Sequence, residues 1–132
     1  MIKVEHIGIA VADGEQSTDL FEKLLGTSHY KIEKVESEGV ATYFYQIGNT
    51  KIELLKAISP TSPIAKFIDK KGQGMHHIAF LVEDIKSEID RLTKLGFEVI
   101  GDVKKGADNK LICFLHPKTT NGVLIELCQE QK

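Results

Sequence analysis

Alternating apolar and polar positions, bounded by glycine, proline or asparagine, mark eight short segments of the chain. This period of two is typical of half-buried strands. The pattern predicts strands over residues 2–11, 29–36, 39–47 and 50–57, and again over residues 75–82, 97–104, 110–116 and 122–129. Gly48-Asn49 is a strong turn signal between the third and fourth strands.

A helical spacing of apolar residues follows the first strand of each group. Asp13 is expected to cap one helix and Asp84 the other, and Gly26 and Gly96 are expected to end them. The predicted apolar face of the earlier helix consists of Leu20, Phe21, Leu24 and Leu25. The predicted face of the later helix consists of Ile85, Ile89, Leu92 and Leu95.

The segment Ser59-Pro-Thr-Ser-Pro63 is the clearest break between the two groups. It also predicts a short helix, with Ser62 as its cap, Pro63 at its first position and an end near Gly72. We therefore predict one domain over residues 1–132, with a first module at about 1–58, a linker helix at about 59–73 and a second module at about 74–132. The expected class is α+β, in which two tandem βαβββ modules form a curved mixed sheet with helices outside.

The two modules repeat each other in sequence. The segment HIGIAV at residues 6–11 matches HIAFLV at 77–82, and KIELL at 51–55 matches LIELC at 124–128. His77 follows His6 by 71 residues and Glu126 follows Glu53 by 73, so a small insertion explains the difference. A unit found twice predicts a pseudo-twofold domain and not a solenoid, which needs at least three units.

Strand alternation gives these residues a direction. His6 shares a strand face with small residues, and Glu53 and Glu126 each point away from their apolar neighbours. His76 and His77 must point to opposite faces, and the repeat selects His77 as the equivalent of His6. A single such histidine or glutamate is usually structural or solvated, but the repeat relates all four. We therefore predict a metal site in the cup of the sheet, with His6, Glu53, His77 and Glu126 as ligands.

Imidazole and carboxylate ligands together suit one divalent ion, which could be cobalt, manganese, nickel, zinc or magnesium. The other histidines carry less information. His29 is expected at the surface, and His116, before Pro117 and Lys118, is expected to be structural or close to a substrate.

Composition narrows the function classes. The chain has 132 residues, of which 42% are hydrophobic and 27% charged, and its net charge of −2 argues against a nucleic-acid binder. No apolar run approaches the roughly 20 residues that span a bilayer, and no export signal begins the chain. Cys113 and Cys128 are therefore expected to be reduced core residues of a cytoplasmic protein. The only arginine is Arg91.

The motifs resemble the vicinal oxygen chelate superfamily, which includes glyoxalase I, extradiol dioxygenases and bleomycin-resistance proteins. The similarity covers nearly the whole chain. Within the superfamily the chain most resembles the methylmalonyl-CoA epimerases, through residues 5–11, 48–55, 62–67, 74–79, 114–118 and 122–127. The stretches 62–67 and 116–118 favour the epimerases, whereas the histidine and glutamate pattern specifies only the superfamily.

The resemblance implies an enzyme that epimerises an acyl-CoA thioester, with His6, Glu53, His77 and Glu126 as metal ligands and a homodimer as the assembly. We expect Glu126 to be a catalytic base and Glu53 its pseudo-symmetric partner. Either glutamate could act as a base while loosely bound to the metal, or both could be ligands only. Some epimerases carry a further glutamate where this chain has Thr42, and some carry glutamine in place of Glu53.

Three other functions use the same fold. Glyoxalase I has the same four ligand types. Its pocket would benefit from arginine side chains that bind the carboxylates of glutathione through two hydrogen bonds each, and this chain has only Arg91. An extradiol dioxygenase would keep three protein ligands on iron. A non-enzymatic binding protein would be expected to lack the full ligand set.

Overall fold

The structure is a computed structural model that describes residues 1–131. In that range the chain forms eight strands and three α-helices, in the order βαβββ, helix, βαβββ, with two short 3-10 turns. This order confirms the predicted α+β class and the two βαβββ groups. The chain divides into two compact units: the first unit comprises Ile7–His76, and the second comprises Met1–His6 and the chain from His77 onward. Strands β1 (Lys3–Val11) and β5 (Gly74–Leu81) each run from one unit into the other.

The first unit contains the remainder of β1 and three further strands in the order β2-β3-β4-β1. Both β2–β3 and β3–β4 pair antiparallel. The elements of this unit are α1 (Gly14–Leu25), β2 (Lys31–Val35), a 3-10 turn (Glu36–Glu38), β3 (Val40–Ile47), β4 (Thr50–Ala57) and α2 (Pro63–Lys71).

The second unit has its strands in the order β5-β8-β7-β6. The β5–β8 pair is parallel, and the β8–β7 and β7–β6 pairs are antiparallel, which makes the sheet mixed as predicted. Its elements are α3 (Ile85–Lys94), β6 (Val99–Lys105), β7 (Lys110–Leu115), a 3-10 turn (Pro117–Thr119) and β8 (Ile125–Glu130).

The helix ends follow the capping residues of the sequence. Asp13 Oδ1 accepts a hydrogen bond from Gln16 N at 2.9 Å, and Gly26 ends α1 in the left-handed conformation that glycine tolerates best. Ser62 Oγ accepts from Ala65 N at 3.1 Å, with Pro63 in the first turn of α2. The carboxylate of Asp84 caps α3 in the same way. All three predicted caps are confirmed.

Part of the predicted helical faces was wrong. Phe21 and Leu25 pack against the sheet, but Leu20 and Leu24 are 55% and 70% exposed. Leu95 is also exposed, because it lies at the cap position beyond the last turn of α3. A short helix on a sheet buries one stripe of its surface, so four adjacent apolar positions cannot all face the core.

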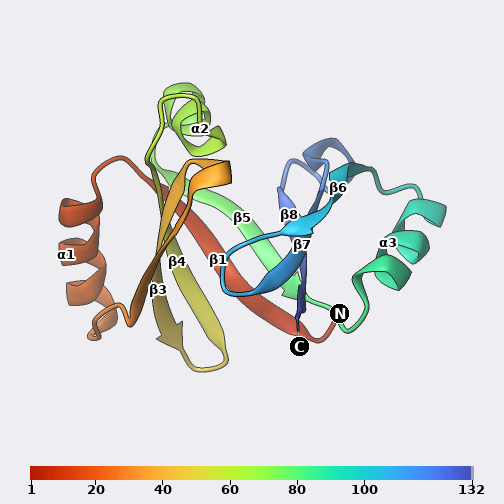
Figure 1. Cartoon of the computed structure of the whole chain (residues 1–132), viewed down its shortest axis with the longest axis horizontal. Helices are drawn as coiled ribbons and strands as arrows, with labels where there is room; N and C mark the ends of the chain where they lie inside the picture. Colours follow the sequence, from red (N-terminus) through yellow and green to blue (C-terminus); the bar gives the residue numbers. More distant parts are fainter. Residues whose placement is uncertain (132) are drawn as a thin grey trace. The chain divides into compact units, whose positions relative to one another are not determined.

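Helices pack against the sheet of each unit (Figure 1), and in the first unit α2 packs through Ile64 on the Leu55 face, opposite to α1. In the first unit α1 packs through Phe21 and Leu25 against the face that carries Tyr45 and Leu54. In the second unit Ile85 and Leu92 of α3 pack against the face that carries Cys113, Leu115 and Leu127. Glu126 lies between Ile125 and Leu127 on β8, so its side chain is on the sheet face away from α3.

Substitution of Leu127 tests the packing of α3 against the sheet. It is fully buried under α3, so Leu127→Ala should lower the free energy of unfolding by about 2–5 kcal/mol through lost apolar burial and a cavity. Leu24→Ala, at an exposed position, is the matched control and should change it by less than about 0.5 kcal/mol. Urea denaturation of the two variants measures both values, and equal losses would contradict this description of the core.

None of the helices in residues 1–131 has the length and apolar character needed to cross a membrane.

Candidate metal centre

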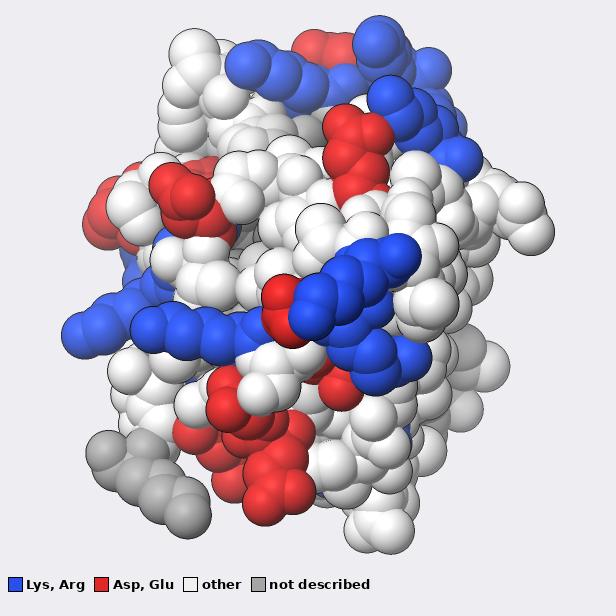
Figure 2. Space-filling model, turned by 90° about the vertical axis from the view of Figure 1, so that its right-hand side faces the viewer, with Lys and Arg blue, Asp and Glu red and all other residues white. Residues whose placement is uncertain are grey.

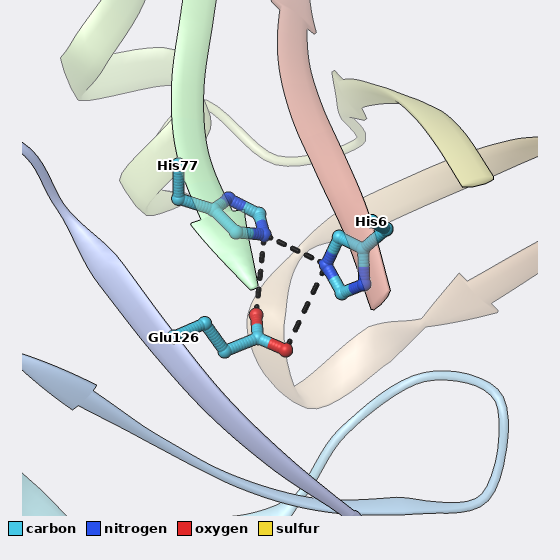
Figure 3. A group of neighbouring side chains, drawn as sticks. All are labelled: His6, His77 and Glu126. Carbon is cyan, nitrogen blue, oxygen red and sulfur yellow. Dashed lines mark hydrogen bonds and ion pairs between the residues drawn. The ribbon is translucent and has the colours of Figure 1, made fainter. Parts of the chain in front are cut away.

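Three strands bring His6, His77 and Glu126 together in the second unit (Figure 3). His6 comes from β1, His77 from β5 and Glu126 from β8. The Nε2 atoms of the two histidines are 2.9 Å apart. Glu126 Oε1 lies 3.2 Å from His77 Nε2, and Glu126 Oε2 lies 3.7 Å from His6 Nε2. Three side chains from distant parts of the sequence therefore converge on one point.

The register of the sheet explains this convergence. Glu126 pairs with Ala79 of β5 across the parallel ladder, and Ala79 shares a strand face with His77 because the two are two residues apart. The methyl group of Ala79 leaves room for the longer side chains beside it. Phe114 of β7 pairs with Glu126, and its ring meets the His77 ring edge-on at 5.8 Å. His77 therefore has an apolar wall on one side and a carboxylate on the other.

The cluster is almost closed to solvent. His6, His77 and Glu126 are 6%, 6% and 5% exposed. Burial alone would raise the pKa of the Glu126 carboxyl, but the adjacent His6 and His77 rings lower it by more, to about 2. Glu126 is therefore an anion at neutral pH, which is the form that binds a cation.

A further carboxylate stands behind His6. Glu5 Oε1 lies 2.7 Å from His6 Nδ1, and Glu5 is itself only 4% exposed. Sequence reasoning missed this residue, because alternation places Glu5 and His6 on opposite faces of β1. The available signal was an acidic residue within a strand that is otherwise mostly apolar.

These residues fit a divalent metal ion. Two ligand atoms bound at about 2.0–2.2 Å from one ion lie roughly 3–3.6 Å apart. The distance between the two Nε2 atoms and the two distances from Nε2 to the Glu126 oxygens are close to that range. Histidine and glutamate are residue types that bind borderline metals. Three of the four predicted ligands thus come together in one unit.

Glu53, the fourth predicted ligand, lies on β4 in the first unit and is 4% exposed. It pairs with Phe44 on β3, and Thr42 pairs with Leu55 beside it, so Glu53 and Thr42 share one face of the sheet. That face is opposite to the one that packs against α1, because Leu54 lies between Glu53 and Leu55. Its role as ligand or base stays a prediction.

The other histidines are not part of the cluster. His76 meets the ring of Phe67 on α2 at 4.9 Å. His116 Nδ1 accepts a hydrogen bond from Lys118 N at 3.1 Å and so begins the 3-10 turn, a structural role. His29 is partly exposed, with its side chain 29% accessible, and its Nδ1 lies 2.7 Å from Glu22 Oε2. Spacing along the chain does not reveal such a partner on a neighbouring helix.

The two cysteines are free and buried, as predicted. Burial, together with the nearby negative charge of Glu126, raises the pKa of the Cys113 thiol to about 11. Because the thiolate is the reactive form, the native protein should react very slowly with Ellman's reagent at neutral pH and fully once denatured. Absorbance of the released thionitrobenzoate measures this, and rapid reaction of the native protein would contradict the burial of both thiols.

Comparison with known proteins identifies the family. Residues 5–114 match the family model described as glyoxalase/bleomycin resistance protein/dioxygenase superfamily. An ethylmalonyl-CoA/methylmalonyl-CoA epimerase of Cereibacter sphaeroides is 41% identical over 130 residues, which cover 96% of this chain and 97% of that protein. An uncharacterised protein of Bacillus subtilis is 38% identical over 130 residues, with 98% and 93% covered.

Solved structures agree with this result. A methylmalonyl-CoA epimerase in complex with methylmalonyl-CoA and NH4+ superposes with a TM-score of 0.93 at 30% sequence identity, covering 98% of this chain and 95% of that one. The family match, the full-length similarity and the fold lead to the same conclusion. The chain belongs to the glyoxalase/bleomycin resistance protein/dioxygenase superfamily.

Proposed function

We propose that this protein is a metal-dependent epimerase of methylmalonyl-CoA, which removes the α-proton of the thioester and returns one to the opposite face. The observation that carries the proposal is the buried convergence of His6, His77 and Glu126 in a chain whose full-length relatives are named for this activity. A relative of similar fold has been solved with methylmalonyl-CoA bound.

In this proposal His6, His77, Glu126 and Glu53 hold one divalent ion. When bound, such an ion would supply Lewis-acid stabilisation of the negative charge that develops on the thioester oxygen. Glu53 enters through the sequence repeat, since it occupies in the first module the place that Glu126 occupies in the second. Its burial and its position on the sheet face opposite to α1 support the assignment.

Glu126 is the proposed base. Its carboxylate has two oxygens, so one could accept the α-proton while the other remained available as a metal ligand. The low pKa keeps Glu126 ionised at neutral pH, so it needs no prior deprotonation. The α-proton of a thioester is much less acidic than a carboxylic acid, so a carboxylate can remove it only when the negative charge that develops on the thioester oxygen is stabilised.

Epimerisation needs a second group that returns a proton to the opposite face of the planar enolate. We assign this role to Glu53, the repeat partner of Glu126. Thr42 has no carboxylate and cannot replace the glutamate that some epimerases place in this strand. The homodimer, the cytoplasmic location and the single domain with two modules also stay predictions.

Glyoxalase I is the second candidate, because it shares the superfamily and the four ligand types. Arg91 argues against it. Its guanidinium is already paired with Glu88 on α3, on the helix-covered side of the sheet, where it cannot bind the carboxylates of a glutathione substrate in this cluster. Figure 2 shows basic and acidic side chains interspersed on one face of the molecule.

Assays of both substrates separate these functions. The metal-loaded protein should epimerise methylmalonyl-CoA, detected by coupling to a stereospecific mutase, and should form little lactoylglutathione from the methylglyoxal–glutathione adduct. The opposite preference would favour glyoxalase I. Two histidines and one carboxylate also bind iron in mononuclear oxygenases, so oxygen consumption with a catechol and ferrous ion is the third arm and should be absent.

A further inference from the structure

The contact between Glu5 and His6 determines which ring nitrogen of His6 carries the proton. A neutral imidazole carries a proton on one nitrogen and a lone pair on the other, and an ionised carboxylate only accepts hydrogen bonds. With Glu5 Oε1 2.7 Å from Nδ1, an ionised Glu5 can accept this hydrogen bond only when the proton is on Nδ1. The lone pair is then on Nε2, the atom that lies 2.9 Å from His77 Nε2 and 3.7 Å from Glu126 Oε2.

Both partners of this contact are buried, at 4% and 6% exposure, so water competes little for either group. A hydrogen bond between buried charged and polar groups is stronger and more directional than one at the surface. A carboxylate on the far nitrogen of a metal-binding histidine orients the ring and raises the basicity of the near nitrogen. Glu5 has this placement behind His6.

We propose that Glu5 is a positioning residue that acts through His6. It holds the Nδ1-protonated tautomer and the ring orientation, so that Nε2 presents its lone pair to the metal ion. Glu5 does not touch the reacting atoms. This inference rests on the metal site of the proposed function, and it adds a residue that neither the repeat nor the ligand pattern indicates.

The test uses protein labelled with ¹⁵N in its histidines. Long-range ¹H–¹⁵N correlation spectra report which ring nitrogen of His6 is protonated, in the metal-free protein and with Zn²⁺ bound, at mildly alkaline pH. Wild-type protein should show a protonated Nδ1 in both states and a shifted Nε2 with Zn²⁺. In Glu5→Leu the metal-free ring should populate both tautomers, and the dissociation constant for Zn²⁺ should rise roughly 10- to 100-fold.

Two further variants sharpen the result. Glu5→Gln keeps an oxygen that accepts the Nδ1 proton but removes the charge, so its affinity should fall between wild type and Glu5→Leu, and it carries the test if Glu5→Leu does not fold. Glu98→Gln is the matched control: it removes a half-exposed carboxylate, paired with Lys118, from the same unit and should leave the affinity and the His6 spectrum unchanged.

An unprotonated Nδ1 in the wild type, or wild-type affinity and tautomer in Glu5→Leu, would overturn the inference. The failure of the proposed function looks different. If the wild type bound no Zn²⁺, Co²⁺ or Mn²⁺, the metal-dependent mechanism would be wrong. The tautomer of the His6 ring in the metal-free protein would still decide whether Glu5 positions that ring.

Discussion

Replacing Glu126 with glutamine is expected to slow exchange of the methylmalonyl-CoA α-proton with solvent by roughly 10²- to 10⁴-fold, the contribution typical of a general base. Glutamine has nearly the same shape, and its amide oxygen can still face His77, but it cannot take up a proton at neutral pH. The buried position of Glu126, at 5% exposure, limits replacement of the lost base by bulk water. Deuterium incorporation from heavy water, followed by ¹H NMR, measures the effect.

Glu126 is also a proposed ligand, so metal content must be measured in the same sample. Glu130→Gln is the matched control, because Glu130 lies on the same strand but is exposed, and it should retain wild-type exchange. Slow exchange with full metal content assigns Glu126 as the base. Wild-type exchange in Glu126→Gln would remove Glu126 from the mechanism.

The second large effect is expected at the histidines. His6→Ala and His77→Ala should each lose most of the bound divalent metal on dialysis, with a loss of affinity greater than the roughly 10- to 100-fold typical of substitutions behind a ligand. Each removes one of only a few ligand atoms from a buried cluster. Elemental analysis after dialysis against metal-free buffer gives the occupancy directly.

His76→Ala provides a control that differs by one position along β5. His76 meets Phe67 and is not part of the cluster, so this variant should keep its metal. Strand alternation, which separates His76 from His77, is therefore tested by the same experiment. Unchanged occupancy in both His6→Ala and His77→Ala would overturn the ligand set.

The sequence was most informative where a local rule determines the outcome. Capping depends on one side chain and the backbone next to it, so Asp13, Ser62 and Asp84 could be placed without the fold. The choice of His77 over His76 needed only the period of two in a strand and the internal repeat. The α+β class and the βαβββ order followed from the same patterns.

Other features depend on neighbours that the sequence does not reveal. Periodicity could not decide which of the adjacent leucines of α1 face the sheet, and Leu20 and Leu24 proved exposed. The last strand begins at Ile125, three residues later than predicted, because the segment after the 3-10 turn is still irregular at Gly122.

Glu5 was missed for a different physical reason. Alternation describes the direction of the Cα–Cβ bond, whereas a glutamate has further rotatable bonds and can turn its carboxylate toward an adjacent residue. The 2.7 Å contact with His6 is therefore compatible with a backbone that directs the two side chains apart. Contacts of this kind become visible only when side chains are placed in three dimensions.

We propose that the buried histidine and glutamate cluster makes this chain an epimerase of methylmalonyl-CoA. The most direct test follows the α-proton of methylmalonyl-CoA by ¹H NMR in heavy water, with the metal-loaded protein and with the metal-free protein. We expect rapid loss of the α-proton signal with the metal-loaded protein and slow loss without metal. Retention of the signal in the presence of protein with full metal content would contradict this proposal.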